Sequence, residues 1–186
     1  MPAKTTKRVL LITGSPEVGK TTTLIKVVDL LREKGYNVGG MISREVREAG
    51  IRVGFEILDL SSQKRGWLAH IKQKTGPQVG KYHVNLEDLE AVGAQAITEA
   101  TENCDIVAID EIGPMEMFSE KFKEAVRKAL ESPKLVIAVI HWKAQDKLIN
   151  AIKNLKDAET FTVTPEKRDQ LSQTIAEKAV QSLLPS

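Results

Sequence analysis

The segment GSPEVGKTT, from Gly14 to Thr22, has the residue types and the spacing of a phosphate-binding loop, G-x-x-x-x-G-K-[ST]. Gly14 and Gly19 let the backbone curl so that successive N–H groups point at phosphate oxygens. Lys20 can neutralise the β- and γ-phosphates, and the Thr21 hydroxyl can ligate Mg²⁺. The residues predicted to bind the phosphates of a nucleoside triphosphate are Gly14, Ser15, Pro16, Glu17, Val18, Gly19, Lys20, Thr21 and Thr22.

Two adjacent acids, Asp110 and Glu111, follow the apolar run Ile106 to Ile109. An aspartate after a buried strand is typical of the acid that holds Mg²⁺ beside a phosphate loop, so we expect Asp110 and Thr21 to share the metal. Glu111 could orient a water and accept its proton during in-line attack on the γ-phosphorus. Glu111 and Lys20 are therefore the predicted catalytic residues, and both acids also belong to the predicted nucleotide site. The alternatives are a turn or capping aspartate and a solvated loop glutamate.

Glu116 is a third acid in the same stretch, but Gly113-Pro114 separates it from the strand. An acid near the start of a helix is favoured by the helix dipole. We expect Glu116 to begin the helix that starts near Phe118, with a role in the site as the alternative.

Removal of a γ-phosphate benefits from a further cation beside the loop lysine. Arginines between Arg44 and Arg52 alternate with Glu45 and Glu48, so cross-strand ion pairs on a solvated face are the other interpretation. His141 ends an apolar run and could sense the γ-phosphate, or it could only be hydrogen-bonded. Arg44, His141 and Arg168 are retained as further site candidates. The full set of candidate cations is Arg44, Arg47, Arg52, Arg65, Lys81 and Arg168.

Strands that alternate with helices must position these residues. Val9 to Thr13 is a β-branched apolar run closed by Gly14, which predicts a strand buried on both faces of a parallel sheet. The alternation predicts an α/β fold in which ligands bind at the carboxyl ends of the strands. The other expected strands are 37–46, 51–60, 106–109, 135–140 and 160–163, and the expected helices are 21–34, 86–103, 118–130, 144–155 and 164–184.

Three stretches have a specific local prediction. Gly50 supplies the turn of a hairpin between the strands 37–46 and 51–60. The segment 64–85 has no clear period and should be loops with one or two short strands. Thr164-Pro165 has the pattern of an N-cap and first-turn proline for the last helix.

Length and composition favour a single domain over residues 1–186, because 186 residues with 41% hydrophobic content can bury one core. The 27 basic and 25 acidic side chains nearly cancel, which argues against a non-specific nucleic-acid binder. Cys104 should be a small buried residue. The polar start and the short run Val9 to Ile12 do not fit a signal peptide, and no run reaches the roughly 20 apolar residues of a membrane span. A cytoplasmic protein is expected.

The chain resembles the P-loop nucleoside-triphosphatases first described in thermophiles, which have a human cancer-related counterpart. The shared stretches, in family order, are GSPEVGKTT, GGMISREVREAGIRVGFEILDL, GPQVGKYHVN, AIDEIGPMEMFSEKF and VTPEKRD. The resemblance implies a three-layer P-loop fold of the RecA-like variant, with a mainly parallel sheet and the hairpin as an antiparallel addition. It also implies Mg²⁺-dependent hydrolysis of ATP, GTP and other nucleoside triphosphates to diphosphate and phosphate, with loose base selectivity.

Two positions depart from the family pattern. The family usually carries glycine where Glu17 stands, which puts an acid near the phosphates that we expect to face outward. It usually carries asparagine where Lys167 stands.

Two other functions fit parts of the sequence. A nucleoside or nucleotide kinase would use the basic segment 64–81 as a lid over an acceptor, but the Asp110-Glu111 pair favours water as the acceptor. A slow nucleotide-dependent switch would act on a protein or RNA partner. The small net charge and the 4% aromatic content argue against RNA, and they leave a protein partner open.

Overall fold

One nine-stranded sheet runs through residues 6–185, the part of the chain that the computed structural model describes. The strand order is β5-β6-β4-β3-β2-β7-β8-β1-β9. Residues 1–5, at the polar start that does not fit a signal peptide, and Ser186 lie outside the described residues. The strands are β1 (Val9–Thr13), β2 (Val38–Glu48), β3 (Ile51–Asp59), β4 (Arg65–His70), β5 (Gln78–Val79), β6 (Tyr82–Val84), β7 (Ile106–Ile112), β8 (Leu135–Ile140) and β9 (Ala158–Thr162).

Five adjacent strands form a parallel half, in which β1 pairs with β8 and β9, and β7 pairs with β8 and β2. Val9, Leu10, Leu11 and Ile12 are all 0% exposed, as expected for a strand covered on both faces. The predicted α/β fold is therefore confirmed. Since β8 lies between β1 and β7, the phosphate loop and the acid pair start from strands that are not neighbours.

The antiparallel part is larger than the single hairpin that the sequence predicts. The hairpin β2–β3 is confirmed, and β4, β6 and β5 extend it in antiparallel pairing. The segment 64–85 thus contains three strands instead of one or two. Strands β5 and β6 are only two and three residues long, so their sequences are too short to show the alternation of apolar and polar residues that identifies a strand.

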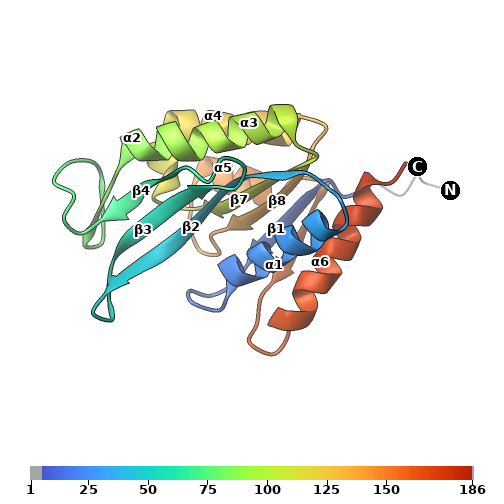
Figure 1. The fold of residues 1–186 in the computed structure, drawn as a ribbon, viewed down its shortest axis with the longest axis horizontal. Coiled ribbons are helices and arrows are strands. Elements are labelled where there is room, and N and C mark those ends of the chain that lie inside the picture. The colour runs from blue at the N-terminus through green and yellow to red at the C-terminus, as the bar shows by residue number, and fades with distance from the viewer. Residues whose placement is uncertain (1–5, 186) are drawn as a thin grey trace.

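Helices cover both faces of the sheet (Figure 1). The side chains of α1 and α6 form one buried cluster with the sheet, and those of α3, α4 and α5 form part of the other. This places helices on both sides of the sheet in a three-layer α/β arrangement. The helices are α1 (Lys20–Glu33), α2 (Leu86–Asp88), the π-helix η1 (Leu89–Ala94), α3 (Gln95–Asn103), the 3-10 helix η2 (Glu116–Phe118), α4 (Glu120–Glu131), α5 (Lys147–Lys153) and α6 (Arg168–Leu183).

The predicted start of the last helix at Thr164-Pro165 is wrong. The Thr164 carbonyl accepts hydrogen bonds from the backbone N–H groups of Lys167 (3.2 Å) and Arg168 (3.0 Å), which closes a turn before the helix. Helix α6 therefore begins at Arg168. The helix predicted from 86 to 103 is continuous but contains the π-helical turn η1.

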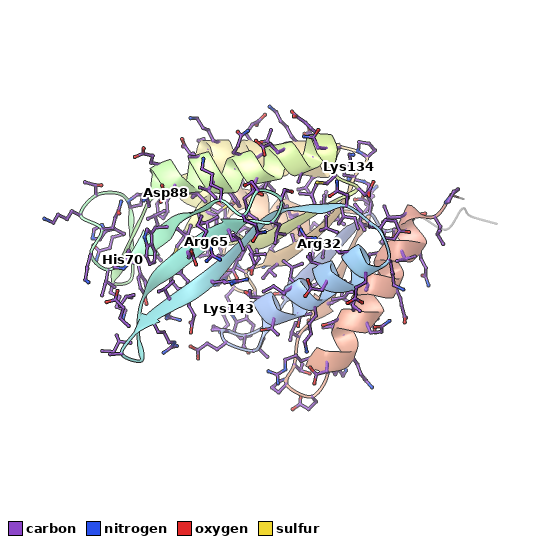
Figure 2. The ribbon with its side chains drawn as sticks, viewed as in Figure 1. Arg32, Arg65, His70, Asp88, Lys134 and Lys143 are labelled. Carbon is purple, nitrogen blue, oxygen red and sulfur yellow. The ribbon has the colours of Figure 1, made fainter. Side chains whose placement is uncertain are left out.

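Arg32 and Lys134, labelled in Figure 2, bind backbone carbonyls at or near the ends of strands. Arg32 Nη2 donates to the carbonyls of Val38 (2.8 Å) and Leu60 (3.0 Å), and Lys134 Nζ donates to that of Cys104 (2.6 Å). Cys104 is 5% exposed, so the prediction of a small buried residue is confirmed. None of the helices within residues 6–185 combines the length and the apolar character that a membrane span requires.

Candidate active site

The phosphate loop connects the carboxyl end of β1 to the first turn of α1. Gly14 and Gly19 have φ angles of 151° and 106°. A Cβ at Gly14 would lie 2.9 Å from the Val163 carbonyl oxygen, so the curl of the loop needs glycine there. Lys20 Nζ donates to the carbonyls of Gly14 (2.9 Å) and Ser15 (3.0 Å), which holds its ammonium group against the loop.

Thr21 and Asp110 are brought into direct contact. Thr21 Oγ1 donates a 2.6 Å hydrogen bond to Asp110 Oδ2, and Asp110 is only 2% exposed. A hydroxyl and a carboxylate are oxygen donors of the kind that Mg²⁺ binds, usually with phosphate and water completing its shell. Among the described residues, no group of three or more His, Cys, Asp or Glu side chains could hold a metal without such help. The donor set therefore fits a metal that is shared with a nucleotide.

Asp110 and Glu111 lie within β7, which continues to Ile112, so the predicted strand end at Ile109 is wrong. The pairing of β7 with β8 is irregular between Ile109 and Ile112, and it resumes where Ile112 pairs with Ile140. An interrupted ladder of this kind re-aims side chains. A Cβ at Gly113 would lie 2.5 Å from Glu111 Oε1, so the absence of a side chain at Gly113 provides the space that the Glu111 carboxyl occupies.

Burial dominates the electrostatics of the acid pair. Desolvation raises the pKa of Asp110 to about 7, with a further contribution from Glu111, while the Thr21 hydrogen bond and Lys20 act in the opposite direction. Desolvation also raises the pKa of Glu111, opposed by the charge of Lys20. Both carboxyl groups therefore change protonation closer to neutral pH than exposed acids do.

Glu116 does not begin the helix α4, as the sequence predicts, but lies in the short turn of helix before it. It begins η2, but Ser119 caps the following helix α4 by accepting the Phe122 N–H at 3.0 Å. Glu116 is 3% exposed and lines the same cleft as Glu111. Burial, and then the charge of Glu111, raise the pKa of Glu116 well above its usual range.

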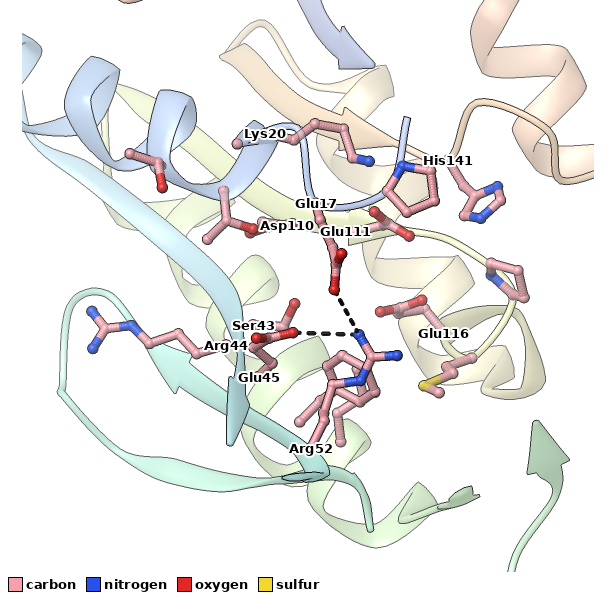
Figure 3. A pocket seen from close by; sticks show the side chains of 18 of the residues that line it. Glu17, Lys20, Ser43, Arg44, Glu45, Arg52, Asp110, Glu111, Glu116 and His141 are labelled. Atoms are coloured by element: carbon pink, nitrogen blue, oxygen red, sulfur yellow. Dashed lines mark hydrogen bonds and ion pairs between the residues drawn. The ribbon is translucent and has the colours of Figure 1, made fainter. Parts of the chain in front are cut away.

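His141 follows β8 and lies near Lys20 and Glu111 (Figure 3). Its Nδ1 accepts the backbone N–H groups of Ala144 (2.9 Å) and Lys143 (3.3 Å). The proton of the neutral ring is therefore on Nε2, which is a donor. Desolvation, and then the charge of Lys20, lower the pKa of His141, so the neutral form prevails at neutral pH.

The six candidate cations fall into two groups. Arg44, Arg47 and Arg52 line the cleft, whereas the lining does not include Arg65, Lys81 or Arg168. Arg65 pairs with Glu56 at 2.9 Å (Figure 2). Arg168 is exposed. Its aliphatic stem packs against the phosphate loop at Gly19, where a Cβ would lie only 2.9 Å from the Cδ of Arg168.

The expected ion pairs of the hairpin are present. Glu45 accepts hydrogen bonds from Arg47 Nε (2.7 Å) and Arg52 Nη1 (3.3 Å). Glu17 has an exposed carboxylate, but it extends across the mouth of the cleft and lies 3.8 Å from both arginines. The hairpin and the phosphate loop are thus linked by charge across the cleft.

The cleft has a volume of about 850 Å³ and continues beyond the phosphate loop. Its far wall is apolar and belongs to the antiparallel strands, with Phe55, Leu68 and Val79, and Met115 closes one side. None of these four residues is among the sequence candidates. Met115 lies inside the DEIGPME stretch, which could have indicated it, whereas the wall depends on pairing between distant strands.

A family model described as "NTPase" matches residues 9–176. The nucleoside-triphosphatase THEP1 of Thermofilum pendens is 46% identical over 167 residues, covering 89% of this chain and 92% of that protein. The nucleoside-triphosphatase THEP1 of Methanosarcina acetivorans is 45% identical over 175 residues, covering 94% and 98%.

Two solved structures have a similar fold. The crystal structure of THEP1 from the hyperthermophile Aquifex aeolicus superposes with a TM-score of 0.78 at 32% identity, covering 90% of this chain and 96% of that chain. The solution structure of a human cancer-related nucleoside triphosphatase gives a TM-score of 0.80 at 34% identity, covering 96% and 100%.

Proposed function

The chain belongs to the nucleoside-triphosphatase family whose model matches residues 9–176, and from this premise we propose that it is a Mg²⁺-dependent enzyme with broad base selectivity. It would hydrolyse ATP, GTP and other nucleoside triphosphates to the diphosphate and phosphate. The observation that carries the proposal is the contact between Thr21 and Asp110 beside Lys20, with Glu111 next in the chain.

The phosphates would bind to the loop from Gly14 to Thr22. Its backbone N–H groups, the N-terminus of α1 and the ammonium group of Lys20 are positive charges or dipoles that suit the β- and γ-phosphates. Thr21 and Asp110 would hold Mg²⁺, which when bound would neutralise charge on the phosphate oxygens. The buried carboxyl of Asp110, with its raised pKa, would be held in the ionised form by that cation.

Glu111 would act as the general base. It would accept a proton from a water whose oxygen forms a bond to the γ-phosphorus, while the bond from that phosphorus to the β–γ bridging oxygen breaks. The electron pair of the broken bond leaves with the nucleoside diphosphate. Burial raises the pKa of Glu111, which makes it a stronger base than an exposed glutamate.

Three further candidates differ in their support. The Nε2–H of His141 is free of the backbone contacts that engage Nδ1, and it could donate to a γ-phosphate oxygen. Arg44 lines the cleft, but its guanidinium points away from Glu17 and Arg52 (Figure 3). Arg168 would act through its packing against the loop, since the cleft lining does not include it.

Broad base selectivity is supported by the chemistry of the cleft. Its lining among residues 6–185 includes no asparagine or glutamine, the side chains whose paired donor and acceptor read base edges. Trp142, which is 40% exposed at the cleft, offers an apolar ring that suits any base. A cytoplasmic location, and a lack of nucleic-acid partners, stay predictions of the sequence.

A kinase is the second candidate function, and one observation favours it. The apolar wall formed by Phe55, Leu68 and Val79 lies beyond the phosphate loop, where an acceptor could bind. The segment 64–81 contributes the strands β4 and β5 to the sheet, with a loop at 71–77 between them.

Phosphate release in the presence of Mg²⁺ tests the proposal. Purified protein would be incubated with ATP, GTP, CTP or UTP, with and without nucleoside and nucleotide acceptors. We expect release without an acceptor, loss of release in Lys20→Ala, and a strong reduction in Glu111→Gln with nucleotide binding retained. Lys26→Ala is the control, because Lys26 pairs with Asp169 outside the cleft. Turnover only with an acceptor would establish the kinase instead.

A further inference from the structure

Arg47 and Arg52 lie directly opposite each other across the hairpin β2–β3. Like charges in this position destabilise a sheet unless acids compensate them. Two acids do so, because Glu45 and Glu17 each pair with both arginines. Since Glu17 belongs to the phosphate loop, the structure concentrates two guanidinium groups at the edge of the site where a triphosphate would bind.

Arg52 is held in place by an aromatic wall. Its Nε donates to the Tyr82 hydroxyl at 2.9 Å, and its guanidinium carbon lies 5.3 Å from the Phe55 ring centre and 5.8 Å from that of Tyr82. The hydrogen bond to Tyr82 is the main reason that the pKa of Arg52 is raised. A guanidinium that is oriented in this way loses little freedom when it binds an anion.

Of the two remaining contacts of Arg52, one is with Glu45 on the hairpin and the other is with Glu17 on the phosphate loop (Figure 3). Nη1 lies 3.3 Å from Glu45 and 3.8 Å from Glu17. A separation of 3.8 Å is longer than a hydrogen bond, so a phosphate oxygen with more charge can replace Glu17 as its partner. Within the described part of the chain, Nη2 of Arg52 donates no hydrogen bond.

The other cleft arginines are less suited to this role. Arg47 is engaged by Glu45 at 2.7 Å and by the Gly50 carbonyl at 3.0 Å. Arg44 points away from the loop (Figure 3). Arg47 approaches Glu17 at the same 3.8 Å, so the feature that distinguishes Arg52 is the orientation of its guanidinium by Tyr82 and Phe55.

We propose that Arg52 is a catalytic residue that contacts the γ-phosphate and stabilises its charge in the transition state, so that this chain supplies its own arginine in cis. The proposal rests on the proposed hydrolysis. As the bond from water to the γ-phosphorus forms and the bond to the bridging oxygen breaks, the proton goes to Glu111 and the electron pair goes to the diphosphate. Arg52 takes no part in these transfers, and it acts only on the charge of the equatorial oxygens.

Arg52→Gln tests the proposal by two measurements, steady-state hydrolysis of ATP with Mg²⁺ and binding of ADP with and without aluminium fluoride. Loss of a transition-state donor lowers kcat by about 10²- to 10³-fold while KM changes little. We expect ADP to bind as in the wild type, and the complex of ADP with aluminium fluoride, which mimics the transferred phosphoryl group, to be lost. Arg65→Gln is the matched control, because Arg65 pairs with Glu56 on the same sheet but does not line the cleft.

The outcomes separate this proposal from the proposed function. A wild-type kcat and a normal aluminium fluoride complex in Arg52→Gln would overturn the role of Arg52 and leave hydrolysis standing. A wild type that releases no phosphate would overturn both. If Arg52→Gln does not fold, Arg52→Lys decides, because it keeps the charge but replaces the planar guanidinium, whose Nε binds Tyr82 while its Nη atoms face elsewhere, by a single ammonium nitrogen. A reduced kcat with normal ADP binding in Arg52→Lys supports the proposal, and an unchanged kcat contradicts it.

Discussion

The Thr21 hydroxyl donates a 2.6 Å hydrogen bond to Oδ2 of Asp110, so the phosphate loop and strand β7 meet directly although β8 lies between β1 and β7. The hydrogen bond favours the ionised carboxylate, but the cost of burying that charge is larger and the pKa of Asp110 rises to about 7. The ionised form of Asp110 is therefore unfavourable for folding when nothing compensates its charge, and a bound cation would compensate it.

Asp110→Asn should make the protein more stable at alkaline pH in the absence of Mg²⁺ and nucleotide. The pKa of Asp110 is 3.8 in an exposed setting and about 7 in the fold, so its contribution to the free energy of unfolding is full below pH 3.8 and is lost as the pH rises to about 7. Above pH 7 the burial of the charge costs up to about 4 kcal/mol, which asparagine avoids. Urea unfolding at pH 5 and pH 8 measures the difference, and phosphate release should be lost in the same variant.

The control for this experiment is Asp29→Asn, which changes an exposed acid on α1. It should follow the pH dependence of the wild type. If Asp110→Asn also does so, the carboxyl is already ionised in the fold and the burial argument is incorrect.

Glu111→Gln and Glu116→Gln should have different effects on hydrolysis. Glu116 is buried and Glu111 is partly buried. Burial raises the pKa of Glu116 well above its usual range, so glutamine resembles its protonated form. We expect Glu116→Gln to keep kcat near that of the wild type, and Glu111→Gln to lower it by about 10²- to 10⁴-fold, as for loss of a general base. Phosphate release measures both. Equal losses would place Glu116 in the chemistry.

Glu17→Gln should tighten nucleotide binding. The Glu17 side chain is 70% exposed, and it lines the cleft near the phosphate loop, where its charge repels a triphosphate. At a separation of about 4 Å in water one charge pair is worth about 1 kcal/mol, which corresponds to a change of up to about fivefold in Kd. Glu17→Gly should act likewise, since glycine readily adopts the φ of 62° found there.

Titration with ADP at low and high salt measures this effect, which should shrink as salt screens the charge. Glu33→Gln, at the far end of α1, is the control. Weaker binding by Glu17→Gln would show that the carboxylate stabilises the loop more than it repels the ligand.

The parts of the site that lie close together in the sequence were predictable from it. The phosphate loop is nine consecutive residues that all serve to bind phosphate, and the acid pair directly follows an apolar run in the sequence. Glu116 was not predictable, because its burial depends on the turn at Gly113-Pro114 rather than on its distance from α4. The position of Arg52 depends on Tyr82 in β6, a strand of three residues that joins the sheet through β4. No local pattern reports such pairing.

Gly40→Ala should prevent folding, whereas Gly35→Ala should not. Both glycines have positive φ angles, of 115° and 92°. A Cβ at Gly40 would lie 1.9 Å from the Ala108 carbonyl oxygen on β7, and a Cβ at Gly35 would have no atom within 4 Å. Gly35→Ala then costs only the backbone strain of about 1–2 kcal/mol, while Gly40→Ala separates β2 from β7 and exceeds about 5 kcal/mol. Urea unfolding measures both, and a folded Gly40→Ala protein would contradict the close packing of these strands.

Trp142 should report nucleotide binding through its fluorescence. The chain has two tryptophans of similar exposure, Trp142 at 40% and Trp67 at 37%, and only Trp142 lines the cleft. Trp67 instead packs edge-on against His70 with 4.6 Å between the ring centres. A ligand that covers the cleft changes the polarity around the indole of Trp142, so ADP should change the emission of the wild type and of Trp67→Phe but not of Trp142→Phe. A signal that disappears in Trp67→Phe would place the ligand against the antiparallel strands, away from the phosphate loop.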